Sequence, residues 1–502
     1  MRVVLVGFGP VGVRFAEELL PAIDEGSLSL TVIGAEPGAP YNRIMIAEYA
    51  TGEVSRESLE IADLDHLAAR GVRVLSGRSA ARIDRGAREV VLGDGGRVPY
   101  DQLVLATGAE ATVPAINGLE RRDPTRDGLD PELTGGVIAM RSIGDAERAR
   151  TVVASGGRIA VLGAGVLGLE TALLFADVGA RPRLAHVGPA PMPRQLDRGS
   201  AHVVTALIDR AGVDIVANVR AEAIITRESG GGRAFHALVS SDGRRIEADL
   251  LVLSCGVRPR TRLASDAGLR TSRGILVDDR LRSWSDPRIR AIGDVAHVAD
   301  PRRYAHEREV PGGPAGLVGA GWRQAEWLAG ALIAGEDPSP FAEDSPGIVL
   351  LKSRHVDLVQ GGEIVPDPFA PGSGEVASWA DPRHGTYVAM STTNGVLDGF
   401  VAVGMPRAAA ELSLLFQRRG ELPSDRSLLL RLDAAEQPVR ATGRDETVCI
   451  CNAVTAGGIE DAVSDGCDTV DAVGCATRAG TGCGGCRARI AEMIDEWQGQ
   501  HV

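Results

Sequence analysis

Two glycine-rich turns, each between an expected strand and an expected helix, constrain the fold of this chain more than any other feature of its sequence. The first follows the apolar run at residues 1–6, and the second follows residues 158–162. Both have the pattern G-x-G-x-x-G, and their glycines are Gly7, Gly9, Gly12, Gly163, Gly165 and Gly168. In this pattern the first glycine makes a tight bend, the second lets backbone N–H groups approach a pyrophosphate, and the third allows close helix packing. Because a helix N-terminus also attracts phosphate charge, the sequence predicts two dinucleotide-binding units.

The composition is that of a soluble globular protein with several domains. The chain has 502 residues, of which 44% are hydrophobic and 24% are charged, so a disordered or fibrous protein is excluded. The formal net charge of −13 disfavours non-specific binding to nucleic acid or to anionic membranes. No apolar run approaches the roughly 20 residues needed to span a bilayer, and residues 1–12 lack the cleavage site of a signal sequence. We therefore expect a cytoplasmic protein.

The strands that follow the two turns end differently. The strand expected at residues 30–33 ends near Glu36, where a carboxylate can accept hydrogen bonds from an adenosine ribose. A solvated surface acid is the alternative, because Gly34 or Ala35 could equally occupy that position. The corresponding strand of the second unit ends at His186 with no acid, so the choice between NADH and NADPH stays open. Three arginines near that strand could instead meet a 2′-phosphate, namely Arg181, Arg183 and Arg194.

The cysteines gather at the C-terminal end. Six of the seven follow residue 448, which makes a poor disulfide framework and a good local metal site. A C-x-C pair and a distant C-x-x-C pair are formed by Cys449, Cys451, Cys483 and Cys486. Four thiolates can hold either zinc or an iron–sulfur cluster. We expect Cys467 and Cys475 to be small packing residues, and Cys255, on an apolar strand, to be a buried structural thiol.

The order of motifs resembles one family of flavoproteins. Besides the two turns, the chain has strands that run into glycine at residues 102–108 and 250–256, and a Gly-Asp pair after the strand at 289–292. Over residues 1–335 this order resembles the flavoproteins with two dinucleotide-binding domains, the pyridine nucleotide-disulfide reductase-like fold. The resemblance implies FAD at the first turn and NADH or NADPH at the second. It implies that FAD is also contacted by Thr107, Gly108 and Asp294, and that Glu170 lies near the nicotinamide; a charge at the first helical turn is the alternative role for Glu170.

The segment Tyr41-Asn42-Arg43 resembles that of rubredoxin-reductase-like and nitrite-reductase flavoproteins, which implies that Arg43 contacts FAD. A surface salt bridge is the alternative. Many relatives carry a lysine five residues later, where this chain has Glu48, so the electrostatic tuning of the flavin is left open. No cysteine precedes Cys255, whereas thioredoxin- and glutathione-reductase-like enzymes need paired thiols beside the flavin. Electrons must therefore leave the flavin by another route.

Residues 446–494 resemble the bacterioferritin-associated-ferredoxin-like 2Fe-2S domain, which implies that Cys449, Cys451, Cys483 and Cys486 are the cluster ligands, with zinc as the alternative. The whole chain resembles the flavoprotein portion of the assimilatory nitrite reductase large subunit and the electron-transfer subunits of assimilatory nitrate reductase. We expect a relay from NAD(P)H through FAD and the 2Fe-2S cluster to a redox partner protein. Because the chain ends at Val502, without a sirohaem module, that partner is expected to be a nitrate or nitrite reductase catalytic subunit.

Three other functions fit the same motifs. The chain could be a reductase for a ferredoxin, a rubredoxin or a monooxygenase; a redox-sensing cluster protein; or an oxidase that reduces oxygen at the flavin.

The expected fold class is α/β, with two Rossmann-like dinucleotide-binding domains, an α+β interface domain and a small helical 2Fe-2S domain. We expect an FAD-binding domain at residues 1–115 and 257–335 and an NAD(P)H-binding domain at 116–256. The interface domain is expected at 336–440 and the 2Fe-2S domain at 441–502. A stretch rich in Pro, Ser and acidic residues at 336–346 predicts a linker, and the resemblance implies a possible homodimer through residues 340–420.

Overall fold

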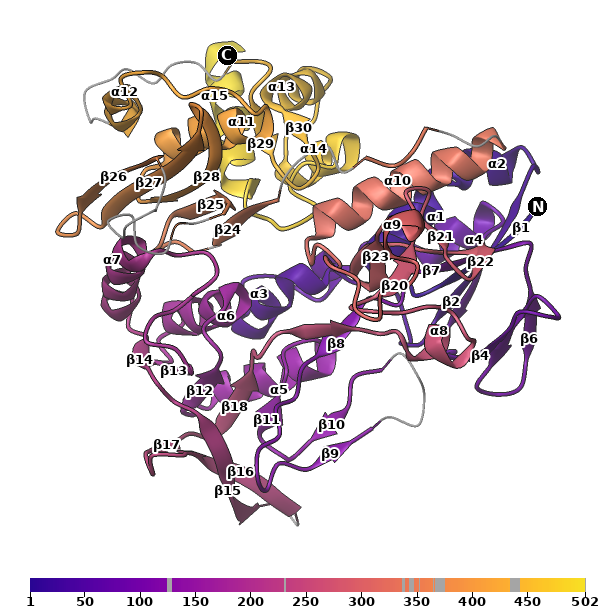
Figure 1. The fold of residues 1–502 in the computed structure, drawn as a ribbon, viewed down its shortest axis with the longest axis horizontal. Coiled ribbons are helices and arrows are strands. Elements are labelled where there is room, and N and C mark those ends of the chain that lie inside the picture. The colour runs from indigo at the N-terminus through magenta and orange to yellow at the C-terminus, as the bar shows by residue number, and fades with distance from the viewer. Residues whose placement is uncertain are drawn as a thin grey trace.

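Three large sheets and a small C-terminal group of helices are the main parts of the structure, a computed structural model (Figure 1). It describes residues 1–123, 129–229, 232–335, 339–342, 347–351, 353–363, 365, 375–433 and 443–501. Within these ranges, no helix combines the length and the apolar sequence that crossing a membrane requires.

The first sheet carries the first glycine turn. The apolar strand β1 (Arg2–Val6) pairs in parallel with β2 (Ser29–Gly34) and β7 (Gln102–Leu105), and α1 (Pro10–Glu18) begins directly after the turn. The turn therefore lies at the carboxyl end of a strand with parallel neighbours on both sides, where open α/β sheets bind ligands. The strand order is β23-β20-β21-β22-β7-β1-β2-β3, in which the other strands are β3 (Arg73–Ser76), β20 (Ile275–Val277), β21 (Arg282–Ser283), β22 (Asp286–Ala291) and β23 (Ala296–Val298).

The second sheet repeats this arrangement around the second turn. Its strands are all parallel, in the order β11-β18-β12-β13-β14. The central strand β12 (Ile159–Leu162) is buried along its whole length, and α6 (Val166–Asp177) begins after the turn. The remaining strands are β11 (Val137–Ile138), β13 (Arg183–Ala185), β14 (Asp214–Val216) and β18 (Leu250–Leu253). A continuous apolar run is expected for a strand that is covered on both faces.

The chain crosses from the first sheet to the second and back again, and the two crossings are neighbouring strands. β8 (Ala109–Ala111) leaves the first sheet and β19 (Val257–Pro259) returns to it, and the two are antiparallel. The first sheet thus takes strands from both before and after the second, as expected. The proposed domain boundaries remain a prediction.

The third sheet is antiparallel. Its strands include β24 (Ile348–Leu351) and β27 (Thr386–Thr393). The order is β24-β25-β28-β27-β26, completed by β25 (Leu358–Gly362), β26 (Glu375–Asp381) and β28 (Val396–Val403). Helix α11 (Pro406–Gln417) packs against it, with Phe416 edge-on to Phe400. Most of the linker expected at residues 336–346 lies outside the described residues.

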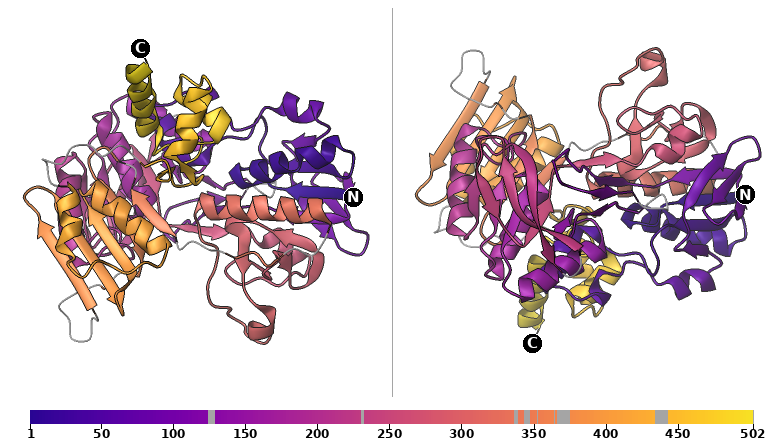
Figure 2. Two further views of the ribbon diagram at one scale, coloured as in Figure 1. Left: turned by 90° about the horizontal axis from the view of Figure 1, so that it is seen from above. Right: turned by 90° about the horizontal axis from the view of Figure 1, so that it is seen from below.

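The cysteine-rich end forms a small unit with its own core. It has a short hairpin of β29 (Thr447–Cys449) and β30 (Val454–Thr455), and three helices, α13 (Ala456–Ser464), α14 (Val470–Thr477) and α15 (Arg487–His501). Ile459, Val473 and Ile490 are fully buried within it. Figures 1 and 2 show this unit (yellow) between the third sheet (orange) and the N-terminal part of the first sheet (indigo).

One buried polar contact joins the second and third sheets. The Tyr387 hydroxyl on β27 donates to Oδ2 of Asp197 over 2.7 Å. Oδ1 of Asp197 accepts from the backbone N–H of Ser200 and caps helix α7 (Arg198–Arg210). Both Tyr387 and Asp197 are buried, and burial, together with the neighbouring Asp197 carboxylate, raises the pKa of Tyr387. The hydroxyl is therefore the donor in this contact.

Tyr387→Phe should lower the free energy of unfolding by about 1–3 kcal/mol, because it leaves a buried carboxylate oxygen without its partner. Urea denaturation followed by circular dichroism measures the change. Tyr304→Phe, on the partly exposed helix α9 (Pro301–Tyr304), is the control and should change stability by less than about 0.5 kcal/mol. Equal stabilities of Tyr387→Phe and the wild type would contradict this role for the contact.

Candidate functional site

The first glycine turn is held by a close approach of backbone atoms. Gly7 has φ of +108°, and a Cβ there would lie 2.1 Å from the Ala106 carbonyl oxygen. A Cβ on Gly12 would lie 2.3 Å from the Gly7 carbonyl oxygen, whereas a Cβ on Gly9 would have no atom within 4 Å. The fold itself therefore requires Gly7 and Gly12. Gly9 instead leaves open space over the N-terminus of α1, which fits the close approach of a pyrophosphate.

The second turn has the same three environments. Gly163 has φ of +114°, and its Cβ would lie 2.1 Å from the Ser254 carbonyl oxygen. A Cβ on Gly168 would lie 1.9 Å from the Gly163 carbonyl oxygen, and one on Gly165 would meet nothing within 4 Å. The two turns are thus structurally equivalent, and each leaves room at its middle glycine.

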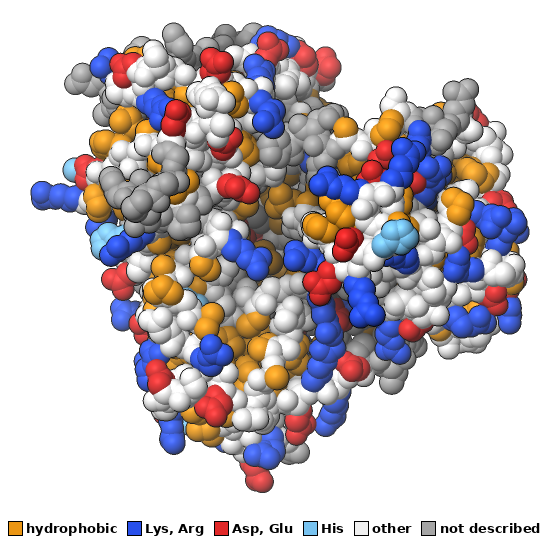
Figure 3. Space-filling view, viewed as in Figure 1, with side chains coloured by type: hydrophobic (Ala, Val, Ile, Leu, Met, Phe, Trp, Pro, Cys, Tyr) orange, Lys and Arg blue, Asp and Glu red, His pale blue; other side chains and the backbone are white. Residues whose placement is uncertain are grey.

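A single cleft of about 2390 Å³ links the first turn to the cysteine-rich end. Figure 3 shows the surface hollowed between the lobes of the molecule, with arginine side chains around the hollow. The predicted site residues in its wall are Gly7, Gly9, Gly12, Glu36, Arg43, Thr107, Gly108, Glu170, Asp294, Cys451 and Cys483. The other predicted site residues are not part of the cleft wall as the described residues form it. They are Gly163, Gly165, Gly168, Cys449 and Cys486.

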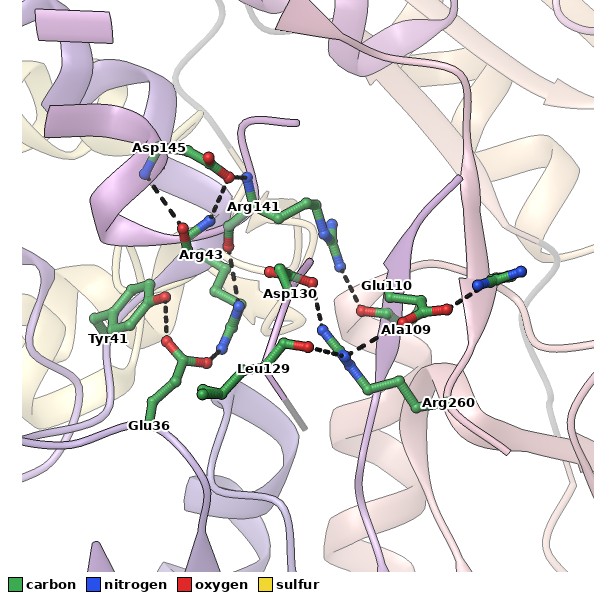
Figure 4. A network of polar contacts seen from close by, with 12 residues as sticks. Glu36, Tyr41, Arg43, Ala109, Glu110, Leu129, Asp130, Arg141, Asp145 and Arg260 are labelled. Carbon is green, nitrogen blue, oxygen red and sulfur yellow. Dashed lines mark hydrogen bonds and ion pairs between the residues drawn. The ribbon is translucent and has the colours of Figure 1, made fainter. Parts of the chain in front are cut away.

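Glu36 and Arg43, predicted separately, touch each other. An Arg43 Nη2–H donates to Glu36 Oε1, and the Tyr41 hydroxyl donates to Glu36 Oε2 over 2.6 Å (Figure 4). Each carboxylate oxygen retains a further lone pair, so Glu36 can still accept a ribose hydroxyl. Arg43 therefore does form a salt bridge, the alternative role considered for it. This salt bridge lies in the cleft wall, where the nucleotide is expected. The roles of both residues remain predictions.

Two more arginines lie beside Arg43. Arg43 Nη1 donates to the Arg141 carbonyl oxygen over 2.9 Å, and Arg260 reaches Asp130 and the Leu129 carbonyl oxygen from the other side (Figure 4). The Arg141 Nε atom is buried and has no hydrogen-bond partner in the described part of the chain. Burial lowers the pKa of Arg43 to about 10, and the charges of Arg141 and Arg260 act in the same direction. Desolvated cations close together fit an anionic group such as the FAD pyrophosphate.

Two other carboxylates in the cleft wall, those of Asp294 and Glu170, are partly or fully buried. Asp294 lies on the short turn after β22, and burial raises the pKa of its carboxyl group while Arg141 opposes the shift. The neighbouring Gly293 N–H donates to the side chain of Gln324 over 2.8 Å, which holds this turn. Glu170 is 7% exposed in the first half of α6. Both side chains thus lie in the wall of the cleft, and their roles toward a ligand remain predictions.

The four predicted ligand cysteines contact one another. Cys449 Sγ lies 3.7 Å from Cys451 Sγ, and further thiol contacts join Cys449 to Cys486 and Cys451 to Cys483. Donation from the two neighbouring thiols holds the pKa of Cys449 well below its usual range. Within the described ranges, no three ligating side chains already surround one ion position, so the group is a chain of adjacent thiols. Its all-sulfur donor set fits an iron–sulfur cluster or zinc.

The remaining cysteines differ from one another. Cys467 packs against the core of the C-terminal unit, as expected. Cys475 is exposed on α14, so the expectation that it packs is wrong. Cys255 is partly buried and its thiol donates to the Leu162 carbonyl oxygen over 3.4 Å. Burial raises the pKa of Cys255 to about 11, which fits a structural thiol.

The arginines proposed for a 2′-phosphate are not all near the second turn. Arg183 begins β13 and pairs with Asp214, and Arg181 precedes it, whereas the turn follows the carboxyl end of β12. Arg181 and Arg183 are therefore not brought to the turn, because parallel strands point their carboxyl ends the same way. Arg194 is exposed after β13. Directly after β13, burial lowers the pKa of His186, which favours the neutral imidazole.

Glu48 lies on α3 (Ile46–Thr51), outside the wall of the cleft as the described residues form it. Arg141 and Arg260 are not among the site residues predicted from the sequence. Arg141 belongs to the loop before α5 (Ile143–Ala154), and Arg260 lies four residues after the strand-closing Gly256. That position after a closing strand is the one local signal that could have found Arg260, and Arg141 has none.

Comparison with known proteins identifies relatives of both parts. The sequence model of the pyridine nucleotide-disulphide oxidoreductase family matches residues 1–315, and that of the BFD-like [2Fe-2S] binding domain matches residues 447–496. Nitrite reductase [NAD(P)H] of Bacillus subtilis (strain 168) is 28% identical over 504 residues, covering 99% of this chain and 58% of that protein. The assimilatory nitrate reductase electron transfer subunit of the same organism is 28% identical, covering 98% of this chain and 59% of that protein.

The chain thus spans less than two thirds of the length of these relatives. Among solved structures, the covalent putidaredoxin reductase-putidaredoxin complex aligns with a TM-score of 0.70 at 23% identity, over 85% of this chain and 95% of that one. The fold predicted from the sequence is confirmed. The matched families imply FAD, NAD(P)H and a 2Fe-2S cluster, as predicted.

Gly9→Ala should leave the fold intact but place a methyl group where the pyrophosphate approaches. We expect FAD binding to weaken roughly tenfold, equivalent to about 1.4 kcal/mol, with an unchanged Tm of the FAD-free protein. Gly12→Ala should lower that Tm as well, because its Cβ meets a backbone oxygen. Titration of the FAD-free proteins with FAD and thermal unfolding measure both effects. An unchanged dissociation constant for FAD in Gly9→Ala would contradict the approach of the pyrophosphate to this turn.

Because the raised pKa of Cys255 keeps its thiol protonated, alkylation of Cys255 should be slow at neutral pH and should accelerate up to about pH 11. Iodoacetamide labelling followed by peptide mass spectrometry measures it, with the exposed Cys475 as the internal reference. Cys255→Ser should leave the NAD(P)H oxidation rate unchanged. Labelling of Cys255 as fast as Cys475 at neutral pH would contradict this.

Proposed function

Since this chain belongs to the pyridine nucleotide-disulphide oxidoreductase family, we propose that it is the electron-transfer subunit of a nitrate- or nitrite-reducing system. The chain is an FAD-dependent NAD(P)H oxidoreductase with an appended BFD-like [2Fe-2S] domain. In the proposal, electrons from NADH or NADPH pass through FAD and the cluster to a nitrate or nitrite reductase catalytic subunit. The similarity to the two nitrogen-oxide relatives over 98–99% of the chain supports this acceptor.

The continuous cleft is the observation that carries the proposal. It runs from the first glycine turn, past Asp294 and Glu170, to Cys451 and Cys483. A hydride donor, a flavin and a metal cluster can thus share one continuous cleft. FAD, when bound, supplies the conversion of a two-electron hydride into single electrons.

The residues of the chain bind and orient the groups in this cleft. We assign Gly7, Gly9 and Gly12 to the FAD pyrophosphate, with Arg43 and Arg141 providing positive charge nearby. We assign Glu36 to the adenosine ribose, and Thr107, Gly108 and Asp294 to the rest of FAD. Gly163, Gly165, Gly168 and Glu170 are assigned to NAD(P)H, and Cys449, Cys451, Cys483 and Cys486 to the cluster. The contacts of the four thiols with one another support the last assignment.

An anaerobic titration with NADH and, separately, NADPH tests the proposal. Flavin bleaching should be accompanied by the EPR signal of a reduced 2Fe-2S cluster, and the effective nucleotide identifies the donor. Cys483→Ser should keep flavin bleaching but abolish electron delivery to the nitrate or nitrite reductase partner. Cys475→Ser, at the exposed cysteine outside the ligand set, is the matched control and should behave as the wild type.

Other outcomes would point to other functions. Unchanged NAD(P)H oxidation by Cys483→Ser, with oxygen as the acceptor, would favour an oxidase that uses the flavin alone. Rapid reduction of a ferredoxin or rubredoxin, with none of a nitrate or nitrite reductase, would show a different acceptor. Slow turnover with every acceptor would favour a redox-sensing protein.

A further inference from the structure

The start of helix α10 (Val318–Ala334) contacts the first glycine turn and the cysteine-bearing loops together. A Cβ on Gly321 would lie 2.6 Å from the Val11 side chain and 3.2 Å from the Gly293 Cα atom, next to Asp294. A Cβ on Gly319 would lie 3.2 Å from the Cys451 carbonyl oxygen. This one helix end is therefore packed against both the expected flavin site and a predicted cluster ligand.

Trp322 extends this contact. Its indole Nε1–H donates to the Pro10 carbonyl oxygen, within the first glycine turn, over 3.2 Å. The opposite edge of the ring lies against Gly482, where a Cβ would stand 2.6 Å from Trp322 Cη2 and 2.8 Å from Cys451 Sγ. Trp322 is 7% exposed. The indole thus spans from the phosphate-binding turn to the loop that carries Cys483.

The same loop is tied down beside the FAD candidates. The Asn42 side-chain amide donates to the carbonyl oxygens of Thr481 and Gly482, over 3.1 and 2.7 Å. Asn42 is 4% exposed and lies between Tyr41 and Arg43 in the sequence. The loop is therefore anchored to the segment that contacts Glu36.

Arg14 lies over the ring of Trp322. The Arg14 guanidinium lies 5.0 Å from the centre of the indole ring. Its Nη2 donates to Asn452 Oδ1 over 2.7 Å and its Nη1 donates to Glu326 Oε1 over 2.8 Å. A cation over an indole face is attractive, and Arg14 is 8% exposed. The ring is thus held between a buried cation and the cysteine loop.

We propose that Trp322 is a positioning residue that holds the Cys451 and Cys483 loops against the first glycine turn, and so sets the separation across which electrons pass from flavin to cluster. This inference rests on the proposed function. Each passage moves one electron from the flavin reduced by NAD(P)H to the oxidised cluster, and no bond or proton is transferred at Trp322.

Gly482 offers a selective perturbation of this contact. Its φ lies outside the left-handed region, so alanine can adopt its backbone conformation. Its Cβ would nevertheless force the indole or the Cys451 sulfur to move. Gly485, in the same loop, is the matched control, because a Cβ there would make an ordinary 3.7 Å contact with Cys483 Sγ. Trp322→Phe removes the indole N–H and part of the ring. Its control is Trp327→Phe on the same helix, where Trp327 packs against Phe341.

The experiment compares the four variants with the wild type, each loaded with FAD and cluster. Anaerobic stopped flow with the effective nicotinamide nucleotide follows flavin bleaching, and rapid freeze-quench EPR follows cluster reduction. Iron and FAD content, and the EPR signal after dithionite reduction, report whether each site is intact.

We expect Gly482→Ala and Trp322→Phe to bleach at the wild-type rate but to slow cluster reduction severalfold, because the rate of electron transfer falls steeply as the distance between donor and acceptor grows. Gly485→Ala and Trp327→Phe should match the wild type in both steps. If Gly482→Ala loses iron, the rate of cluster reduction in Trp322→Phe with full iron content still tests the inference.

Wild-type cluster reduction in an iron-replete Trp322→Phe variant would overturn the inference. Equal slowing in the two control variants would also overturn it, because the effect would then not belong to this contact. Absence of nucleotide-driven cluster reduction in the wild type itself would instead refute the proposed function, and the inference with it.

Discussion

The close approach of backbone atoms at the two glycine turns is the constraint on which the rest of the structure depends. Gly7 lies against the carbonyl oxygen of Ala106, directly after β7. Gly163 lies against the carbonyl oxygen of Ser254, directly after β18. A side chain at either position would separate the turn from that strand. The neighbouring parallel strands, the start of the helix and the open space above the middle glycine all follow from this contact. So does the position of the cleft at the carboxyl ends of the first sheet.

Electrostatics in the cleft complement this backbone geometry. Arg43, Arg141 and Arg260 approach one another from three separate segments, and burial already makes the charge of Arg43 costly. Glu36 and Asp130 neutralise part of this charge, while the buried Arg141 Nε still lacks a hydrogen-bond partner in the described part of the chain. Such a site is stabilised by an anion that accepts several charge-assisted hydrogen bonds. A dinucleotide pyrophosphate has both the charge and the acceptor oxygens, which is why this geometry supports the FAD assignment.

The C-terminal unit is attached to the flavin half by specific contacts. Asn42, Arg14 and Trp322 each contact the cysteine loops or the residues beside them. The Arg478 guanidinium adds an ion pair to Glu18 on α1. These contacts join residues from opposite ends of the chain, and they place Cys451 and Cys483 in the wall of the cleft that begins at Gly7. A domain with its own small core thus becomes part of the same site.

The sequence by itself determined the features that local patterns encode. Both glycine turns, the apolar strands before them, Asp294 after its strand, and the cysteine spacing are short-range signals with a direct physical reason. The strands before the two turns and the helices after them are found in the described structure. Tertiary structure decided the rest. Arg43 meets Arg141 across 98 residues of sequence, and Trp322 meets the loop of Cys483, because folding brings distant segments together without a local pattern. Strand direction removed Arg181 and Arg183 from the second turn, and helix packing left Cys475 exposed. A single sequence specifies its local periodicities, whereas the packing of separate elements selects which side chains share a site.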